Sequence, residues 1–278
     1  MKRAVVTGGS GFLGRKLQAQ LRNEGFSVTS IGRTELGDAT QPVNWKTHLV
    51  DSQPTVIFHL MGTFHAPDEA AFDAAHWHPT LALMQALTDL AWNDIPLFLL
   101  GSVAEYGLVP NERQPISEAE IAQPVSAYGR SKLRVTEMAR HSQLRVTVVR
   151  LFNVFAADMS IRLMPGAVLA QLGNEVIRTG PLDRIRDFLH ADIAMQVLAR
   201  LAQTDGNEKI INLCSGHGWN LREIVEILAQ GKHPIIETPS ASASDVRCCI
   251  GNNDRLASLI GYRPAIPTAE DFTRLLFL

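Results

Sequence analysis

Short apolar runs rich in β-branched residues alternate with longer amphipathic stretches through the first half of the chain. The runs cover residues 2–7, 26–32, 55–60, 95–102 and 144–152, and the segments between them have the apolar spacing of helices. Continuous apolar runs of this length are typical of strands buried on both faces of a parallel sheet. The pattern therefore predicts a Rossmann-type, doubly wound α/β domain over residues 1–152.

The pattern changes after residue 152. A helix is expected over 160–173, strands near 175–178 and 209–214, and a helix over 220–230 with Asn220 as its N-cap. These short, mixed elements predict a smaller α/β region over residues 153–278, which contributes elements back to the first sheet. The Ala- and Ser-rich stretch at 239–245 is the most linker-like part of the chain.

Three glycines follow the first strand in the segment TGGSGFLG. Gly8, Gly11 and Gly14 are spaced as in dinucleotide-binding loops, where glycines allow a tight turn, close approach of a pyrophosphate and close helix packing. Phe12 and Leu13 then begin a helix whose first N–H groups can bind the phosphates. A P-loop is excluded because Arg15-Lys16 stands where Lys followed by Ser or Thr is required. The alternative is a tight turn that binds no ligand.

The end of the second strand indicates which dinucleotide is bound. It carries Gly32-Arg33 and no carboxylate for a ribose 2′-hydroxyl, so Arg33 favours a 2′-phosphate by about 10- to 100-fold. NADP(H) is therefore favoured and NAD(H) remains possible; the less favoured alternative for Arg33 is a solvated cation. Further cofactor contacts are predicted at the adenine and at the end of the third strand: Asp38, Ala39, Leu60, Met61 and Gly62, of which Leu60 and Met61 could equally belong to the core.

A second group of residues suggests proton transfer. Tyr128 and Lys132 are four residues apart in AYGRSK, so on a helix they share one face, and Ser102 ends a predicted strand. A phenol can exchange a proton with a substrate oxygen, a nearby lysine can lower the pKa of that phenol, and a hydroxyl can orient the oxygen. In an open parallel sheet, ligands bind at the carboxyl ends of the strands. We therefore expect Ser102, Tyr128 and Lys132 to be catalytic, with Tyr128 and Lys132 also in contact with the cofactor.

Charge and composition exclude several classes of partner. Lys and Arg total 26 against 28 Asp and Glu, so no basic excess favours nucleic acid. No apolar run approaches the length of a membrane span, and the odd number of cysteines, three, suits a reduced, cytoplasmic protein. His76 and His78 do not converge on a helix, and no metal site is expected.

Several motifs in the expected order resemble the extended short-chain dehydrogenase/reductase family. They are TGGSGFLG at 7–14, GSVAEYG at 101–107, YGRSK at 128–132, RLFNVF at 150–155, RDFLHAD at 186–192, INLCSG at 211–216 and GYRP at 261–264. The resemblance implies that Ser102, Tyr128 and Lys132 form the catalytic triad, and that the C-terminal region binds substrate. It also implies that Asn153 lies by the substrate, that Arg186 binds a nucleotide-sugar diphosphate, and that the protein is a homodimer.

Departures from the family pattern narrow the reaction. Sugar dehydratases of the family carry an Asp-Glu pair where this chain has Val103 and Ala104, so dehydration is disfavoured. A second diphosphate-binding arginine is replaced by Ser242, although Arg247 is near in sequence, and His76 stands where Asn is usual. The segments 101–107 and 179–194 most resemble reductases of 4-keto-6-deoxy sugar nucleotides.

Three functions are consistent with these residues. The first is an NADPH-dependent reductase of a keto sugar or sugar nucleotide, with Tyr128 as general acid. The second is an epimerase that oxidises and re-reduces one sugar carbon with tightly held NAD. The third is a non-catalytic NADP(H)-binding sensor, which would have no need of Ser102, Tyr128 and Lys132 together.

Overall fold

The computed structural model describes residues 2–206, 208–239 and 246–277. The chain folds into two compact units. The first unit contains Met1–Gly107, Ile121–Leu151 and Met195–Ile211, and the second contains Leu108–Glu120, Phe152–Ala194 and Asn212–Leu278. Residues 240–245 of the linker-like stretch lie outside the described residues. They include Ser242, the residue that stands where the family has a second arginine.

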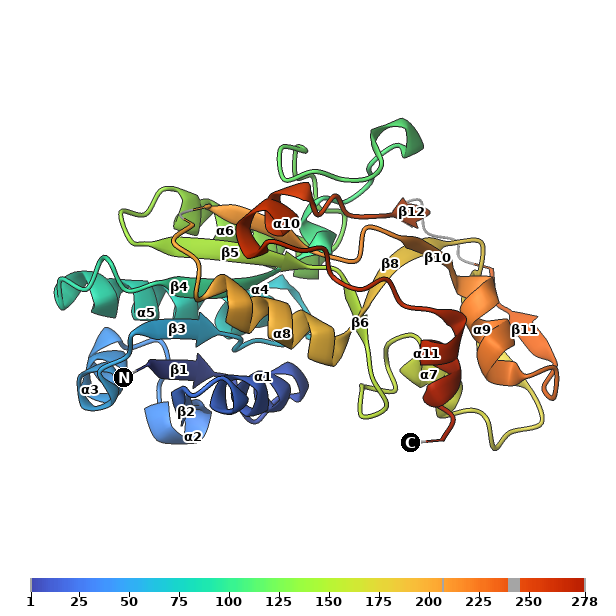
Figure 1. Cartoon of the computed structure of the whole chain (residues 1–278), viewed down its shortest axis with the longest axis horizontal. Helices are drawn as coiled ribbons and strands as arrows, with labels where there is room; N and C mark the ends of the chain where they lie inside the picture. Colours follow the sequence, from blue (N-terminus) through green and yellow to red (C-terminus); the bar gives the residue numbers. More distant parts are fainter. Residues whose placement is uncertain (1, 207, 240–245, 278) are drawn as a thin grey trace. The chain divides into compact units, whose positions relative to one another are not determined.

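The first unit is built on a six-stranded sheet of order β2-β1-β3-β4-β5-β9 (Figure 1). The strands are β1 (Arg3–Thr7), β2 (Ser27–Ile31), β3 (Val56–His59), β4 (Leu97–Ser102), β5 (Val146–Leu151) and β9 (Ile210–Leu213). The pairings of β1 with β2 and β3, of β3 with β4 and of β4 with β5 are parallel. The predicted doubly wound sheet is confirmed.

Helices cover both faces of this sheet. They are α1 (Phe12–Asn23), α2 (Arg33–Leu36), α3 (Pro42–Ser52), α4 (Glu69–Ala75), α5 (Trp77–Asp89), α6 (Ala127–Arg140) and α8 (Ala191–Leu201), with a 3₁₀ turn, η1 (Val103–Glu105), after β4. Side chains of α3, α5 and α6, such as Leu49, Leu83 and Val135, form one buried cluster with Val5 and Ile57 of the sheet. Burial on both faces explains why the strands are continuous apolar runs.

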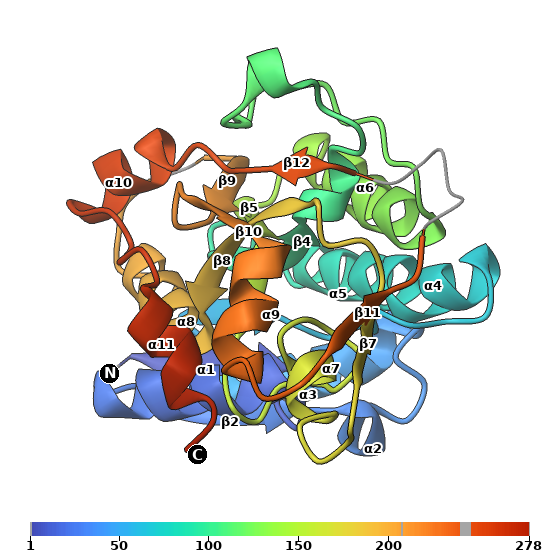
Figure 2. The same cartoon turned by 90° about the vertical axis from the view of Figure 1, so that its right-hand side faces the viewer.

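The second unit is smaller and mixed. A four-stranded sheet pairs β8 (Ile185–His190) with β6 (Asn153–Phe155) and β12 (Cys248–Cys249) in parallel and with β10 (Gly218–Asn220) in antiparallel, and β7 (Ile177–Thr179) pairs with β11 (Ile235–Glu237). Its other elements are η2 (Asn111–Arg113), α7 (Gly166–Leu169), α9 (Leu221–Ala229), α10 (Asp254–Ile260) and α11 (Ala269–Arg274). Helices α9 and α11 lie side by side (Figure 2).

A buried carboxylate joins three segments of the second unit. Asp187 of β8 accepts hydrogen bonds from the N–H and hydroxyl of Ser215, both 2.8 Å or less, and from the N–H groups of Gly216 and Gly251. Burial raises the pKa of Asp187 to about 6, and the four donors oppose that rise. Asp187 thus ties β8 to the turn at 215–216 and to Gly251, two residues after β12.

One predicted helix is wrong. Residues 160–173 were expected to be helical, but only Gly166–Leu169 forms a helix, with turns on either side. Pro165 lies inside the stretch, and proline has no N–H to donate and disfavours a helical residue before it. The N-cap predicted at Asn220 is confirmed, because its side-chain oxygen accepts from the N–H of Arg222 at 2.9 Å.

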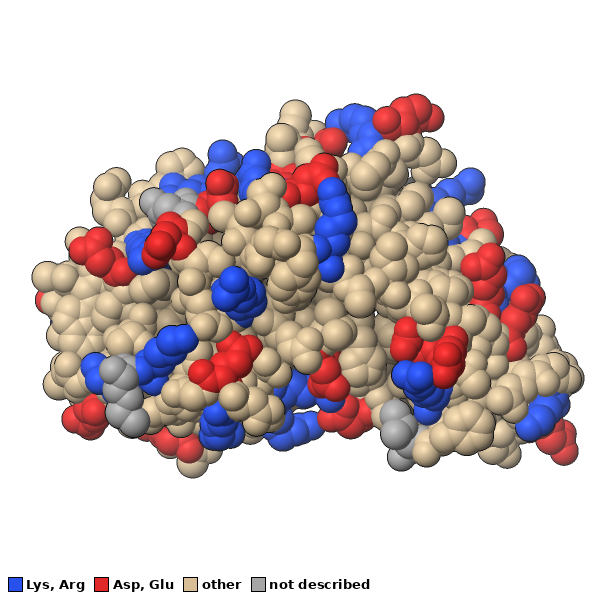
Figure 3. All heavy atoms as spheres, in the orientation of Figure 1, with Lys and Arg blue, Asp and Glu red and all other residues tan. Residues whose placement is uncertain are grey.

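The three cysteines and the charged surface complete the description. Cys214, Cys248 and Cys249 are free thiols, all buried and all in the second unit. On the face drawn in Figure 3, acidic and basic side chains are interspersed and neither sign gathers. Among the described residues, no helix combines the length and the apolarity that a bilayer demands.

Candidate active site

Two glycines of the loop after β1 are required by packing. Gly8 has φ +67°, and a Cβ there would lie 2.9 Å from the backbone of Leu60. A Cβ at Gly14 would lie 2.3 Å from the carbonyl oxygen of Gly8. These distances are too short for any side chain, so the loop rests against the end of β3 and helix α1 rests against the loop.

Gly11 has a different environment. It is exposed, it is the N-cap of α1, and a Cβ there would meet only the carbonyl oxygen of Gly8, at 3.2 Å. Within the described chain no side chain caps this helix, and its first turn carries no acidic residue. The N–H groups of Phe12 and Leu13 in that turn have the donor chemistry that binds a phosphate at a helix N-terminus. The residues present therefore fit a dinucleotide pyrophosphate.

The turn after β2 contains a carboxylate that the strand-end pattern did not reveal. Arg33 is exposed at the start of α2, as expected, but the Glu35 carboxylate folds back and accepts from the N–H of Gly32 at 2.8 Å. The signal was available, because an acidic residue three positions after an N-cap is a capping pattern. A cation and an anion therefore lie at the position where the adenine ribose of a dinucleotide would be recognised.

The remaining predicted cofactor residues differ in what holds them. The Asp38 carboxylate accepts from the N–H and hydroxyl of Thr40, which lowers its pKa, and the carbonyl of Ala39 accepts from Trp45 Nε1 at 2.8 Å. Both residues are thus fixed parts of the loop between α2 and α3.

At the end of β3, Met61 is buried in the core cluster, Leu60 is half-buried and Gly62 is exposed. A Cβ at Gly62 would lie 2.6 Å from the His76 ring and 3.7 Å from Lys132 Nζ. The backbone of the loop after β3 therefore lies beside the predicted catalytic lysine.

The structure brings Ser102, Tyr128 and Lys132 together. Ser102 is the last residue of β4, and Tyr128 and Lys132 project from the same side of α6, whose N-cap Ser126 accepts from the N–H of Gly129 at 3.0 Å. The Ser102 side chain is close enough to the Tyr128 phenol to lower its pKa. Lys132 Nζ lies 6.0 Å from the centre of the Tyr128 ring and donates to the carbonyl of Leu100 at 2.8 Å.

The electrostatics of this group keep the phenol protonated. Burial raises the pKa of Tyr128 to about 12; the Ser102 side chain opposes this rise and the charge of Glu105 adds to it. Burial lowers the pKa of Lys132 to about 8, partly offset by Glu105. Lys132 was expected to lower the pKa of Tyr128. In the protein alone it does not, because the lysine is directed at a backbone carbonyl.

Glu105 is a residue of this site that the sequence analysis missed. It is fully buried, and its oxygens accept from the N–H of Ser102 at 2.9 Å, from Thr136 Oγ1 at 2.7 Å and from Arg150 Nε at 2.8 Å. Arg150 is also buried, with 2% of its side chain exposed. The spacing of Ser102 and Glu105 is that of a capping box. This spacing was the only local feature of the sequence that could have indicated the role of Glu105.

His76 is the second residue whose role the sequence did not reveal. It is 1% exposed, its Nδ1 lies 2.8 Å from Ser131 Oγ and its Nε2 lies 2.8 Å from the Thr63 carbonyl oxygen. Its ring is 5.7 Å from that of Tyr128. Burial, together with the charge of Lys132, lowers the pKa of His76 to about 3. His76 is therefore a neutral imidazole that links α6 to the loop after β3.

No group of three or more metal-ligating side chains comes together in the part of the chain that the structure describes. The buried His59 has neutral partners, since Nδ1 lies 2.8 Å from Thr7 Oγ1 and Nε2 lies 3.1 Å from Thr80 Oγ1. Burial lowers the pKa of His59 to about 3 as well, and the charge of Lys132 contributes.

Asn153 and Arg186 belong to the second unit. Asn153 donates from Nδ2 to the carbonyl of Asp187 at 2.9 Å. The guanidinium of Arg186 donates to the carbonyls of Ile185 at 2.9 Å, Val246 at 2.6 Å and Arg247 at 3.3 Å. Both side chains thus have defined positions on or beside β8.

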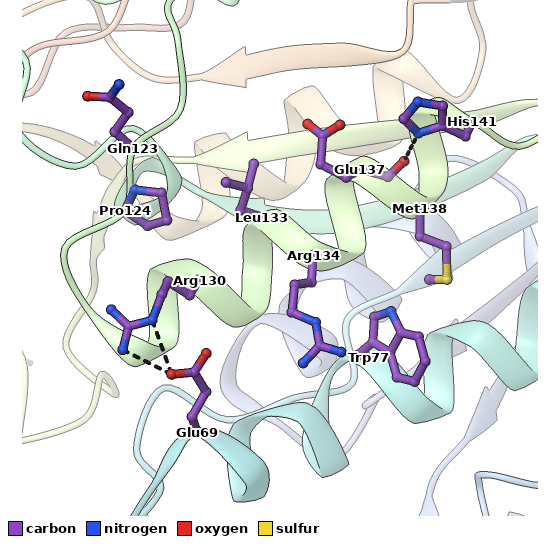
Figure 4. Close-up of a pocket in the computed structure, with 10 residues that line it drawn as sticks. All are labelled: Glu69, Trp77, Gln123, Pro124, Arg130, Leu133, Arg134, Glu137, Met138 and His141. Atoms are coloured by element: carbon purple, nitrogen blue, oxygen red, sulfur yellow. Dashed lines mark hydrogen bonds and ion pairs between the residues drawn. The ribbon is translucent and has the colours of Figure 1, made fainter.

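A groove of about 760 Å³ on the first unit does not include the Ser102 group. It is lined by residues of α4, α5, α6 and the segment before α6, among them Trp77, Leu133 and Met138. Figure 4 shows the ion pair of Arg130 with Glu69 at one end and Trp77 and Met138 at the other. Helices α4 and α6 are joined here by two ion pairs, the second between Arg134 and Asp73.

Comparisons with known proteins agree with this geometry. The family model described as the NAD dependent epimerase/dehydratase family matches residues 4–214. The chain is 27% identical to GDP-6-deoxy-D-talose 4-dehydrogenase of Aggregatibacter actinomycetemcomitans, over 92% of this chain and 90% of that protein. It is 27% identical to GDP-6-deoxy-D-mannose reductase of Pseudomonas aeruginosa, over 99% and 96%. A structure of RMD from Pseudomonas aeruginosa complexed with NADPH superimposes with a TM-score of 0.87 at 26% identity, covering 100% of this chain and 98% of that one.

Proposed function

The chain belongs to the NAD-dependent epimerase/dehydratase family, and on that premise we propose that it is an NADPH-dependent reductase of the keto group of a 6-deoxy sugar nucleotide. The observation that carries this proposal is a protonated phenol, Tyr128, with Ser102 and the buried Lys132 beside it. A phenol that stays protonated at neutral pH is ready to donate a proton, as reduction of a ketone requires. The names of two relatives, a 6-deoxy sugar-nucleotide reductase and a 4-dehydrogenase, support the same substrate class.

The residues that would hold the cofactor are those of the glycine loop and its surroundings. Gly8, Gly11 and Gly14, with the N–H groups of Phe12 and Leu13, would bind the pyrophosphate, and Arg33 would bind a 2′-phosphate. Asp38 and Ala39 are assigned to the adenine side, and Leu60, Met61, Gly62 and Lys132 to the nicotinamide side. NADPH is favoured because Arg33 is exposed at the turn after β2, and the NADPH complex of RMD supports that preference; NADH is compatible with Glu35.

A bound reduced nicotinamide supplies the hydride. The work of the chain's own residues is to hold the ketone and to deliver a proton. Ser102 donates a hydrogen bond to the ketone oxygen, and Tyr128 protonates that oxygen as negative charge develops on it. General acid catalysis of this kind contributes about 10²- to 10⁴-fold. Lys132 keeps a positive charge beside the phenol and is held there by Leu100.

The substrate side is assigned to the second unit. Asn153 is proposed to contact the sugar and Arg186 to bind the diphosphate of the nucleotide. Elimination of water from the sugar is disfavoured, because Val103 and Ala104, which follow Ser102, have no acidic or basic group.

The test is turnover by the purified chain and by Tyr128→Phe. With NADPH and a GDP- or dTDP-linked 4-keto-6-deoxyhexose, the parent should consume NADPH and release the reduced sugar nucleotide. Tyr128→Phe should lower kcat by about 10²- to 10⁴-fold, because the lost hydroxyl acts on the transition state, and should change NADPH affinity far less. Full activity of Tyr128→Phe would refute the assigned chemistry.

The same preparation distinguishes the other two functions. An epimerase has no net redox, so it would retain NAD through purification and interconvert two sugar nucleotides without consuming NADPH. A sensor would bind NADPH and turn over none of the ketones. Either outcome would replace the reductase assignment.

The groove on α4, α5 and α6 supports a homodimer. Its apolar residues Trp77, Leu133 and Met138 continue to the exposed Leu81, one helical turn from Trp77. A second copy offers the same patch about a twofold axis, which is the commonest closed arrangement. Sedimentation should therefore give a dimer that Leu133→Asp dissociates, and a monomeric parent would contradict it.

We further place the protein in the cytoplasm, since its three cysteines are free, and cell fractionation would test this.

A further inference from the structure

We propose that Glu105 is a positioning residue of this active site, whose buried carboxylate fixes the backbone of Ser102 and places a negative charge behind the Ser102–Tyr128 pair. The inference rests on the proposed function, because it assigns Glu105 to a reaction in which Tyr128 gives up a proton. It concerns a residue that touches neither substrate nor cofactor and acts through two residues that do.

One carboxylate oxygen of Glu105 holds the end of β4. Oε1 accepts from the N–H of Ser102 at 2.9 Å, and the Ser102 hydroxyl oxygen in turn accepts from the N–H of Ala104 at 3.2 Å. A Cβ on Gly101 would lie 2.7 Å from the same Oε1, so only glycine leaves room for the carboxylate at this place. The position of the Ser102 hydroxyl therefore depends on Glu105.

The other oxygen anchors the carboxylate to two further elements. Oε2 accepts from Thr136 Oγ1 on α6 at 2.7 Å and from Arg150 Nε on β5 at 2.8 Å. The guanidinium carbon of Arg150 also lies 4.4 Å from the centre of the Tyr106 ring. A fully buried carboxylate with three donors, one of them a buried cation, is held in one place.

The charges around Tyr128 come from several elements. Lys132 lies on the same helix, Glu105 follows β4 and pairs with Arg150 on β5, and His76, at the junction of α4 and α5, is a neutral imidazole. Burial first, and then the charge of Glu105, raise the pKa of Tyr128, and the charge of Glu105 also raises the pKa of Lys132. A carboxylate here thus favours the proton on both groups, as reduction requires.

The test compares removal of the charge with displacement of the carboxylate. Glu105→Gln alone would leave Arg150 buried without a counter-charge, which is strongly destabilising. The double variant Glu105→Gln/Arg150→Met removes both charges and is the informative one. Glu105→Asp keeps the charge but shortens the reach to Ser102. Glu270→Gln is the matched control, since it breaks an exposed Glu–Arg pair, with Arg274 at 2.7 Å, in the second unit.

In steady-state reduction, Glu105→Asp should lose about 10- to 100-fold in kcat, with KM for the sugar nucleotide within about threefold of the parent, because Ser102 is displaced. The alkaline limb of the pH–rate profile, which begins where Lys132 loses its proton near pH 8, should move to lower pH in the double variant, because Glu105 raises the pKa of Lys132, and should stay in place in Glu105→Asp. Glu270→Gln should match the parent in both.

A second measurement does not depend on turnover. The phenol of Tyr128 can be titrated by the absorbance of its phenolate, resolved by subtracting the same titration of Tyr128→Phe. Its midpoint should fall when Glu105→Gln/Arg150→Met is introduced, because the charge of Glu105 raises the pKa of Tyr128. If the parent reduces no ketone, the proposed function fails while this titration still decides the electrostatic role of Glu105.

Two results would overturn the inference. One is a folded Glu105→Asp with the kcat of the parent, since Ser102 would then not depend on the carboxylate position. The other is an unchanged Tyr128 titration in the double variant, since the phenol would then not respond to the charge. In both cases a loss of activity in Tyr128→Phe would show that the catalytic assignment itself still holds.

Discussion

Arg33 and Glu35 stand two positions apart in the turn after β2, and each favours a different cofactor. The guanidinium attracts a 2′-phosphate, and the carboxylate repels it and can accept from a 2′-hydroxyl. Glu35 already accepts from the N–H of Gly32, so its charge lies within the turn. We expect Arg33→Ala to weaken NADPH binding by about 10- to 100-fold and to leave NADH binding nearly unchanged.

Fluorescence titration of the purified variants with the two reduced cofactors measures this selectivity. Glu35→Gln is the matched counterpart, because its amide oxygen can still accept from Gly32 while the charge is lost. It should tighten NADPH and weaken NADH. Equal losses for both cofactors in Arg33→Ala would mean that Arg33 supports the turn rather than the phosphate.

For single residues, what the sequence could predict depends on how far apart the interacting residues lie along the chain. The spacing of Tyr128 and Lys132 and that of the glycines are local patterns. The partners of Glu105 lie on β5 and α6, and those of His76 lie on α6 and after β3, so no local pattern contains them. The shifts of Tyr128 and Lys132 come from burial, which a sequence does not state for a single side chain.

Among the elements, helix α6 is the one that positions the chemistry. It packs directly on η1, the turn that follows Ser102: a Cβ on Gly129 would lie 2.4 Å from the carbonyl oxygen of Ala104 and 2.9 Å from Pro124 Cβ. Gly129→Ala must therefore push α6 away from that turn. We expect it to cost about 1–3 kcal/mol of unfolding free energy and to lower kcat.

Urea unfolding and turnover of Gly129→Ala measure the two effects. Gly180→Ala is the control, because a Cβ there meets no atom within 4 Å and its backbone needs no positive φ. It should change the unfolding free energy by less than about 0.5 kcal/mol. A Gly129→Ala protein as stable and active as the parent would mean that α6 tolerates displacement.

Elements were predictable where the apolar pattern was long and uninterrupted. The strands of the first unit follow from runs such as 95–102, because burial on both faces leaves no ambiguity about what the run packs against. The stretch 160–173 has helical composition, yet Pro165 limits it to one turn. Its shape is set by hydrogen bonds such as Ala167 N–H to Leu163, which the apolar pattern does not specify.

At the scale of the whole molecule, acid should act differently on the two units. His59 and His76, in the first unit, have pKa values of about 3, against about 6.5 in an unfolded chain. The unfolded state binds protons first, so their stabilisation is complete above pH 6.5 and is lost as the pH falls toward 3. Asp187, in the second unit, has the opposite sign: its pKa is about 6 when folded, so its contribution grows as the pH falls through 6.

Hydrogen exchange resolved along the chain at pH 7 and pH 5 tests this contrast. The slowest amides of the first unit should lose about 4 kcal/mol of protection at pH 5, about 2 for each histidine, and those of the second unit should gain about 1 kcal/mol. His59→Asn should halve the loss, whereas His141→Asn, at an exposed position, should not alter it. Equal losses in both units would contradict the assignment to the histidines.

The buried thiols of the second unit can report how often that unit opens. Cys214 is fully buried and Cys249 is 5% exposed, and burial raises the pKa of both, so a thiol reagent reaches these two only after that part of the chain opens. Cys248, at 9% exposed, is less protected. The first unit carries no cysteine at all. The rate at which the buried thiols of the native protein are alkylated therefore reports how often the second unit opens, and it does not respond to opening of the first unit. No label needs to be introduced for this measurement.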